Sequence, residues 1–154
     1  MRYICLCLIM IMVLNNPAAA RNEIQGPIYA DVLKVIDGDT IEVRARTWID
    51  SFVDIRVRLH GIDTPELTRS KCNYERQLAS KALQETRDLI QNKPVKLTKI
   101  KYGKYAGRVL ARVETAAGVD IAAHLVVRKL ARTYDGGKRK TWCEEGALLF
   151  QYSS

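Results

Sequence analysis

Two short acidic stretches, each directly after an apolar run, constrain this chain more than any other feature. They are Asp37-Gly38-Asp39 and Asp63-Thr64-Pro65-Glu66. Alone, the first is an ordinary hairpin turn and the second an ordinary turn or helix start. Together, their carboxylates would form a costly cluster of like charge unless a cation or a phosphate binds there. Oxygen donors without clustered His or Cys indicate a hard ion, calcium before magnesium because the donors lie on flexible turns.

Residues 1–20 have the pattern of a secretory signal peptide. Arg2 precedes an apolar run over residues 3–14, and Ala18-Ala19-Ala20 supplies a small-residue cleavage site. The run is shorter than the ~20 apolar residues that a membrane-spanning helix needs. We therefore expect an extracytoplasmic protein, periplasmic or secreted, with no stable membrane insertion and with one domain over residues 21–154. We also expect it to be a monomer.

The chain is basic, with 25 Lys and Arg against 17 Asp and Glu and a formal net charge of +8. A basic surface favours polyanionic partners, although many basic proteins bind no nucleic acid. Five lysines without an acid between them form either a solvated strand face or a groove that follows phosphates: Lys93, Lys96, Lys99, Lys101 and Lys104.

Two cysteines, Cys72 and Cys143, remain once the signal is removed. An even pair in an exported chain predicts one disulfide. A zinc site is not expected, because His60 and His124 are too far away in sequence for ligand spacing. For both histidines the ordinary interpretation is preferred: solvation for His60 and packing for His124.

Alternating apolar and polar residues predict strands over 29–36, 40–46, 55–60, 95–102 and 108–113, with a turn over 48–54 and a bulge near Lys99. Apolar residues at helical spacing predict a helix over 73–91 with Asn73 as N-cap, and Asp120 is expected to cap a second over 121–130. A capping box, Thr141 with Glu144, predicts a third helix through Leu149. These elements predict a mainly β, α+β fold: a partly open five-stranded OB barrel with about three helices.

The order and gaps of three motifs resemble the staphylococcal-nuclease-like (thermonuclease) family over about residues 29–134. The motifs are Ile36-Asp37-Gly38-Asp39-Thr40, then Arg58-Leu59 followed by Ile62-Asp63-Thr64-Pro65-Glu66, and then Lys104 to Ala111. The resemblance implies an OB barrel and a calcium-dependent phosphodiesterase that acts on DNA and RNA. It implies direct attack of water, which leaves a 3′-phosphate and a 5′-hydroxyl.

The resemblance also implies roles for single residues. Asp39 and Asp63 match the carboxylates that bind calcium, Thr64 matches a ligand that binds through its backbone carbonyl, and Asp37 matches an acid behind these ligands. Glu66 matches the general base, and Arg58 and Arg108 match the two arginines that hold the phosphate. Lys104 and Tyr105 match positions near the terminal phosphate. Two differences concern the loops: one extra residue precedes Arg108, and the loop after Glu66 is shorter and holds Cys72.

Two alternatives to an enzyme remain. OB barrels often hold single strands without cutting them, so a non-catalytic module that binds single-stranded nucleic acid is the first. A structural or interaction domain is the second. A pure binder has no need of Asp39, Arg58, Asp63 and Glu66 together, which favours the nuclease.

Overall fold

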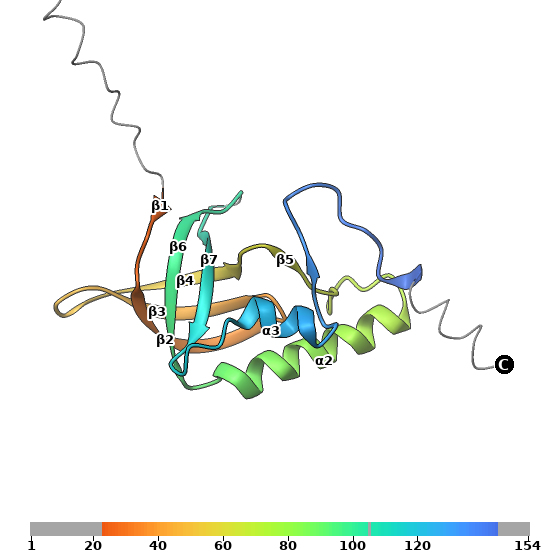
Figure 1. Cartoon of the computed structure of the whole chain (residues 1–154), viewed down its shortest axis with the longest axis horizontal. Helices are drawn as coiled ribbons and strands as arrows, with labels where there is room; N and C mark the ends of the chain where they lie inside the picture. The colour runs from red at the N-terminus through yellow and green to blue at the C-terminus, as the bar shows by residue number, and fades with distance from the viewer. Residues whose placement is uncertain (1–22, 105, 145–154) are drawn as a thin grey trace, which may run out of the picture.

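The structure is a computed structural model of the chain, and it describes residues 23–104 and 106–144. Five strands form a closed barrel (Figure 1): β2 (Ile28–Asp37), β3 (Thr40–Trp48), β4 (Ser51–Leu59), β6 (Pro94–Tyr102) and β7 (Arg108–Thr115). The order is β6-β2-β3-β4-β7, and β6 pairs with β7 to close it. Only the β4–β7 pair is parallel among these strands. The OB-type barrel is thus confirmed, and it is closed where a partly open one was predicted.

Within the described part of the chain two helices pack on this barrel, α2 (Asn73–Ile90) and α3 (Ile121–Val127). Helix α2 contacts β2 and α3, and α3 contacts β7. Three two-residue strands lie outside the barrel: β1 (Glu23–Ile24) on β6, and β5 (Ile62–Asp63) paired with β8 (Arg132–Thr133). Strands this short carry no readable alternation, so the sequence did not predict them. No helix within the described residues is long and apolar enough to span a membrane.

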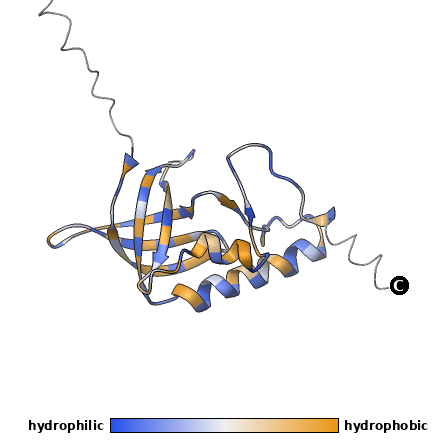
Figure 2. Ribbon diagram, in the orientation of Figure 1, coloured by the Kyte–Doolittle hydropathy of each residue, from blue (hydrophilic) through white to orange (hydrophobic). Residues whose placement is uncertain are grey.

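The core fills the barrel and continues beneath it to the two helices. Apolar residues alternate along the strands of the barrel (Figure 2), as expected for strands with one buried face. The side chains with no exposed surface include Ile41, Val43, Val57, Ile90, Val95, Val113, Ile121 and Leu125. The buried face of α2 has the helical spacing that the sequence predicted, and it includes Ala79, Ala82, Leu83, Thr86 and Ile90.

The structure corrects the turn predicted over 48–54. Strands β3 and β4 extend to Trp48 and Ser51, and only Ile49 and Asp50 form the turn. The extra length projects from the barrel (Figure 1), so no core imposes alternation there, and Trp48 is 74% exposed. The first hairpin turn is likewise shifted by one residue, because Asp37 pairs with Thr40 as the last residue of β2.

The helix ends also differ from the predictions in detail. The N-cap of α2 is Cys72 without a side-chain cap, so Asn73 is the first helical residue and not the cap. Asp120 does cap α3, since its carboxylate accepts a hydrogen bond from the Ala123 amide at 3.0 Å. The predicted bulge is confirmed by a register shift between Thr98 and Lys101.

Some predictions fall outside the described residues. The signal peptide over 1–20, Tyr105 and the part of the third helix beyond Glu144 cannot be compared with the structure. At the start of that helix, the Thr141 hydroxyl accepts a hydrogen bond from the Cys143 amide at 3.2 Å.

The disulfide between Cys72 and Cys143 is present, with Cα atoms 6.0 Å apart. It joins the residue before α2 to the far end of the described chain. Glu75 lies beside both cysteines, but sulfurs in a disulfide are not thiolates, so this group is no zinc site.

Reducing this disulfide should lower the stability of the fold. The bond joins residues 71 positions apart, and closing such a loop contributes on the order of 4 kcal/mol in the chain-entropy model. Urea unfolding with and without dithiothreitol measures the difference. Two free thiols per denatured, unreduced mature chain would contradict the bond.

Candidate active site

The turn between β2 and β3 is fixed by helix α2. The Thr86 hydroxyl, fully buried on α2, donates to the Gly38 carbonyl oxygen at 2.9 Å. A Cβ at residue 38 would lie 2.8 Å from the Ala82 Cβ, so glycine is needed for this close approach. The contact sets the positions of Asp37 and Asp39 on either side of Gly38.

Asp39 and Asp63 are both buried, and Arg58 lies between them. The Arg58 guanidinium binds Asp39 through two nitrogens, Nη1 to Oδ1 at 2.8 Å and Nη2 to Oδ2 at 2.7 Å. Its Nη2 lies 3.5 Å from Asp63 Oδ1. The Thr64 amide donates to Asp39 Oδ2 at 3.4 Å, and the Thr40 hydroxyl donates to Asp39 Oδ1 at 2.8 Å. The two acidic stretches, 25 positions apart, therefore meet around one arginine.

A second arginine, Arg139, also pairs with the acidic residues of this site. Its Nε lies 3.0 Å from Asp63 Oδ1, and its Nη1 pairs with Glu66 Oε1. The sequence analysis did not single out Arg139. The sequence feature that could have pointed to it is the basic run Lys138-Arg139-Lys140 after Gly-Gly, but such a run by itself is typical of a solvated loop.

Glu75, at the third position of α2, organises the loop that carries Glu66. Its carboxylate accepts from the Lys71 amide at 2.7 Å and from the Glu66 amide at 3.3 Å. The side chain is buried, and it reaches back from the helix as the acid of a capping box does. This residue was also missed, because the sequence has no Ser or Thr at the N-cap to complete the motif.

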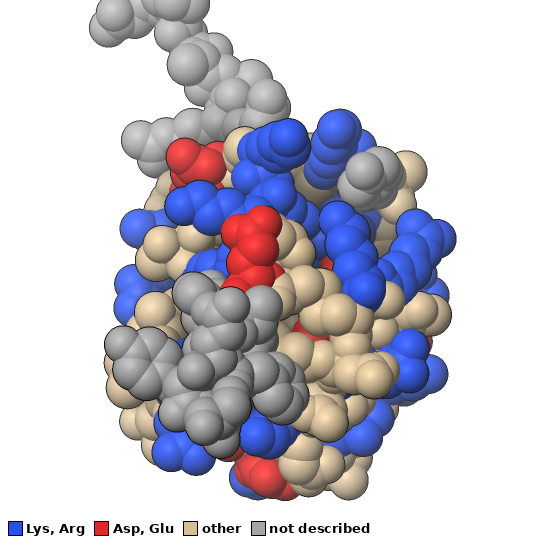
Figure 3. All heavy atoms as spheres, turned by 90° about the vertical axis from the view of Figure 1, so that its right-hand side faces the viewer, with Lys and Arg blue, Asp and Glu red and all other residues tan. Residues whose placement is uncertain are grey.

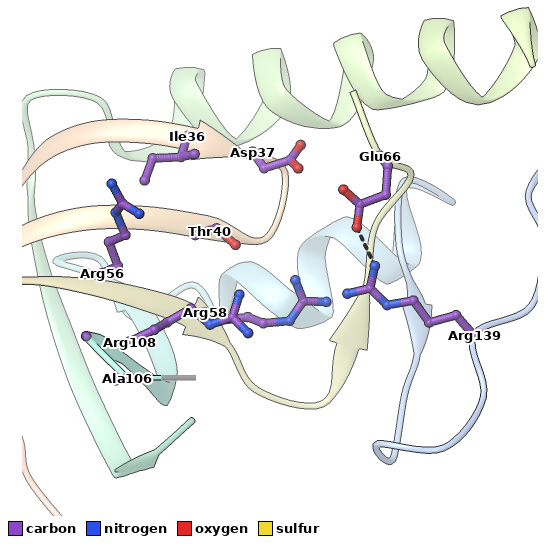
Figure 4. A pocket seen from close by; sticks show the side chains of 10 residues that line it. Ile36, Asp37, Thr40, Arg56, Arg58, Glu66, Ala106, Arg108 and Arg139 are labelled. Atoms are coloured by element: carbon purple, nitrogen blue, oxygen red, sulfur yellow. Dashed lines mark hydrogen bonds and ion pairs between the residues drawn. The ribbon is translucent and has the colours of Figure 1, made fainter. Parts of the chain in front are cut away.

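Arg58, Glu66 and Arg139 line one open cleft of about 400 Å³. Asp39 and Asp63 are not part of its lining but pair with Arg58 and Arg139, which are. Figure 4 shows Arg58 and Arg108 extending toward the middle of the cleft, with Glu66 and Arg139 on the opposite side. Arg56 lines it too, two positions before Arg58 on β4 and opposite Arg108 on β7. The extra residue before Arg108 therefore does not remove this arginine from the cleft. The full lining is Ile36, Asp37, Thr40, Arg56, Arg58, Glu66, Ala106, Gly107, Arg108 and Arg139.

Two carboxyl groups at this site, those of Asp37 and Asp63, have raised pKa values. Burial, and next the Asp39 carboxylate, raise the pKa of Asp37 to about 6, although its hydrogen bond from the Gly38 amide opposes the shift. Burial also raises the pKa of Asp63, while the Arg139 guanidinium lowers it. Both shifts have the direction expected for carboxylates that are desolvated next to another carboxylate.

The donor set of this site fits a hard divalent cation. Asp39 and Asp63 bring buried carboxylates to one place, and Thr64 follows Asp63 directly. Arg58 and Arg139 now pair with these carboxylates, so a cation would have to share them or displace the arginines. Carboxylate and carbonyl oxygens are the ligands that calcium and magnesium prefer. Because the arginines already balance part of the charge, the acidic cluster is less costly without a cation than the sequence suggested.

The other candidate residues have varied surroundings. Lys104 is exposed, next to Ala106 and Gly107 on the wall of the cleft. Lys93 donates to the Asp88 and Leu89 carbonyl oxygens at the end of α2, and Lys96 pairs with Glu114 at 3.2 Å. These two lysines therefore have structural partners. Among the charged residues on the face seen in Figure 3, Lys and Arg still predominate over Asp and Glu.

The histidines and tryptophans have ordinary surroundings. His60 is exposed, and His124 forms a 2.7 Å contact with Glu85. Trp142 is buried beneath the Arg132 guanidinium, and Trp48 is at the tip of the β3–β4 hairpin.

Acidic turns and arginines that meet beside the cleft of an OB-type barrel are the kind of arrangement that binds a phosphate ester. The chain belongs to the family described as staphylococcal nuclease homologue, whose model matches residues 56–151. The match begins within β4, so the turn with Asp37 and Asp39 lies before it.

Two curated relatives resemble the chain, both with the printed name "Uncharacterized endonuclease". One is from Escherichia coli and the other from Escherichia coli O157:H7. Each is 32% identical over 108 residues, 70% of this chain. The matching region spans 62% of the length of each relative.

Proposed function

We propose that this chain is a nuclease that hydrolyses phosphodiester bonds of DNA or RNA and depends on a divalent cation, calcium in the first place. The observation that carries the proposal is the cleft itself: Asp39 and Asp63 face Arg58, and Glu66 faces Arg108 across the open space. Family membership and the endonuclease name of the relatives support the same activity.

Different residues of the site would carry out different parts of the reaction. Asp39 and Asp63, with the Thr64 carbonyl, would hold the cation, which neutralises charge on a phosphate oxygen when it is bound. Arg58 and Arg108 donate to the phosphate oxygens and stabilise the charge that builds up in the transition state. Glu66 takes the proton of the attacking water. Family resemblance suggests direct attack of water and a 3′-phosphate and a 5′-hydroxyl as products.

Export and a monomeric state belong to the same proposal. The signal pattern over residues 1–20 supports an extracytoplasmic location, periplasmic or secreted, and the disulfide fits an oxidising compartment.

Purified mature protein, incubated with labelled DNA and with labelled RNA, tests this function. Calcium should support cleavage, a chelator should abolish it, and calcium added back should restore it. Magnesium should support cleavage poorly if calcium is the preferred cation. Cleavage that survives thorough chelation would contradict the role of the acidic pair.

The binding module remains the second candidate, because Arg139 pairs with both Glu66 and Asp63 and could serve as a permanent internal ion pair. Nucleic-acid binding without cleavage in any calcium-loaded form would favour this candidate.

A further inference from the structure

The segment over residues 132–143, here called the C-terminal strap, runs along one side of the cleft and is attached at both ends. At one end β8 pairs with β5, and the register places Arg132 opposite Asp63. The Tyr134 amide adds a hydrogen bond to the Gly61 carbonyl oxygen at 2.9 Å. At the other end Cys143 is bonded to Cys72. The strap is thus fastened to the strand that carries Asp63 and to the start of α2.

The start of α2 is the same region that positions Glu66. Glu75 accepts hydrogen bonds from the amides of Glu66 and Lys71, and its carboxylate lies 3.9 Å from Cys143 Sγ. Both carboxylates that Arg139 contacts are therefore set by elements to which the strap is attached.

Contacts within the strap join its two ends. The Arg132 guanidinium lies 3.5 Å from the centroid of the Trp142 ring, and it donates to the Thr141 carbonyl oxygen at 3.0 Å. Trp142 is 4% exposed. The two ends of the strap are therefore packed. Residues 135–140 form the loop between them, and this loop places Arg139 at the side of the cleft.

Arg139 has the geometry of a phosphate ligand. Figure 4 shows it across the cleft from Arg58 and Arg108, beside Glu66. Its ion pairs with Asp63 and Glu66 hold the guanidinium at the edge of the space where those carboxylates act. A guanidinium has five N–H donors in a planar fork, so it can hold carboxylates and still donate to a phosphate oxygen.

We propose that Arg139 is a further active-site residue that contacts the substrate phosphate opposite Arg108, and that the Cys72–Cys143 disulfide positions it. The proposal rests on the proposed nuclease function. It predicts that the chain cleaves nucleic acid efficiently only when oxidised. Inside a reducing compartment the same chain would be a poor nuclease, which would limit damage to the nucleic acid of the cell that makes it.

Reduction supplies the simplest test of the disulfide. Dithiothreitol gives two electrons and two protons to the bond, which yields the Cys72 and Cys143 thiols and cyclic oxidised dithiothreitol. The strap then keeps its β8 end and loses its covalent attachment at Cys143. Because a displacement of about 1 Å in a catalytic group can cost ~10²-fold, we expect turnover to fall roughly 10²-fold while the barrel stays folded.

The test combines redox state with substitution of Arg139. Turnover and KM on a labelled oligonucleotide are measured for wild type and Arg139→Gln, each oxidised and reduced. If the disulfide acts through Arg139, the two changes are non-additive: reduction lowers turnover of wild type and leaves the already slow Arg139→Gln variant nearly unchanged. Arg139→Lys, which keeps the charge without the fork, should recover part of the rate, and Lys138→Gln serves as the neighbouring control.

A second measurement does not depend on turnover. Arg139 competes with a cation for Asp63, so Arg139→Gln should raise the calcium affinity measured by calorimetry, and reduction should raise that of wild type but not of the variant. The Cys72→Ser/Cys143→Ser double variant should behave as the reduced protein, with circular dichroism to confirm folding.

The outcomes separate the proposals. Equal turnover by oxidised and reduced wild type overturns the inference alone. An equal loss on reduction in wild type and Arg139→Gln shows that the bond acts through general stability and also overturns it. Absence of cleavage in every oxidised, calcium-loaded form removes the proposed function and the inference with it.

Discussion

Glu66→Gln should lower turnover about 10²–10⁴-fold, the usual contribution of a general base, while fold and nucleic-acid affinity stay close to those of wild type. The amide keeps the size of the carboxylate but cannot accept the proton of the attacking water. The Glu66 side chain is 39% exposed, so loss of its ion pair with Arg139 should cost little stability. Turnover and dissociation constant, measured on the same oligonucleotide, separate the two effects.

Glu114→Gln is the matched control for this experiment. Glu114 also pairs with basic residues, Lys96 at 3.2 Å and Arg112 at 3.4 Å, and its side chain is 23% exposed. It does not line the cleft among the described residues. We expect wild-type turnover from this variant. Wild-type turnover in a folded Glu66→Gln protein would instead remove Glu66 from the role of general base.

Arg58→Met should have the largest effect on stability of any single change in the cleft. The substitution leaves Asp39 and Asp63, whose side chains are 3% and 7% exposed, without their shared guanidinium. Breaking a buried pair from one side typically costs about 3–5 kcal/mol. Urea unfolding in the presence of a chelator measures the loss, and calcium should restore part of it if the carboxylates bind the cation. Turnover should be lost as well.

Two further variants show which property of Arg58 matters. Arg58→Lys keeps the charge but not the two-nitrogen contact with Asp39, so it should recover stability more than turnover. Arg44→Met removes an arginine that also binds a carboxylate through two nitrogens, Nε and Nη2 to Asp54 at 2.7 and 2.8 Å, but at an exposed position. Because exposed ion pairs contribute little, it should lose much less stability than Arg58→Met. If both variants lost a similar amount of stability, the burial of the Arg58 ion pair would not be the reason for its contribution.

The strands and the main helix were predictable because each has a clear period. Strand β3 alternates from Ile41 with one face in the core, and α2 repeats its apolar residues every three or four positions. The same patterns predicted which side chains point away from the apolar face, so Arg58 could be assigned to the face of β4 opposite the core. Where the β3–β4 hairpin leaves the barrel, the core no longer sets the pattern, and the predicted turn was wrong.

The meeting of Asp39 and Asp63 was predictable for a different reason. Each lies at the end of a strand, and hydrogen bonds between β3 and β4 bring those ends together: Thr40 pairs with Arg58, and the Leu59 amide donates to the Asp39 carbonyl oxygen at 2.8 Å. A site built from neighbouring strand ends can be inferred from a sequence.

The sequence by itself determined the barrel, its two acidic turns and the arginine between them, because these depend on local periods and on short connections. Only the tertiary structure decided the rest of the site. Arg139 reaches Glu66 from 73 positions away, and it does so because β8 pairs with β5 and Cys143 bonds Cys72. The Glu75 carboxylate accepts a hydrogen bond from the backbone amide of Glu66, and a pattern of side chains does not reveal a bond to a backbone amide. Contacts of this kind depend on how separate elements pack in space, and a one-dimensional pattern of side chains does not encode that arrangement.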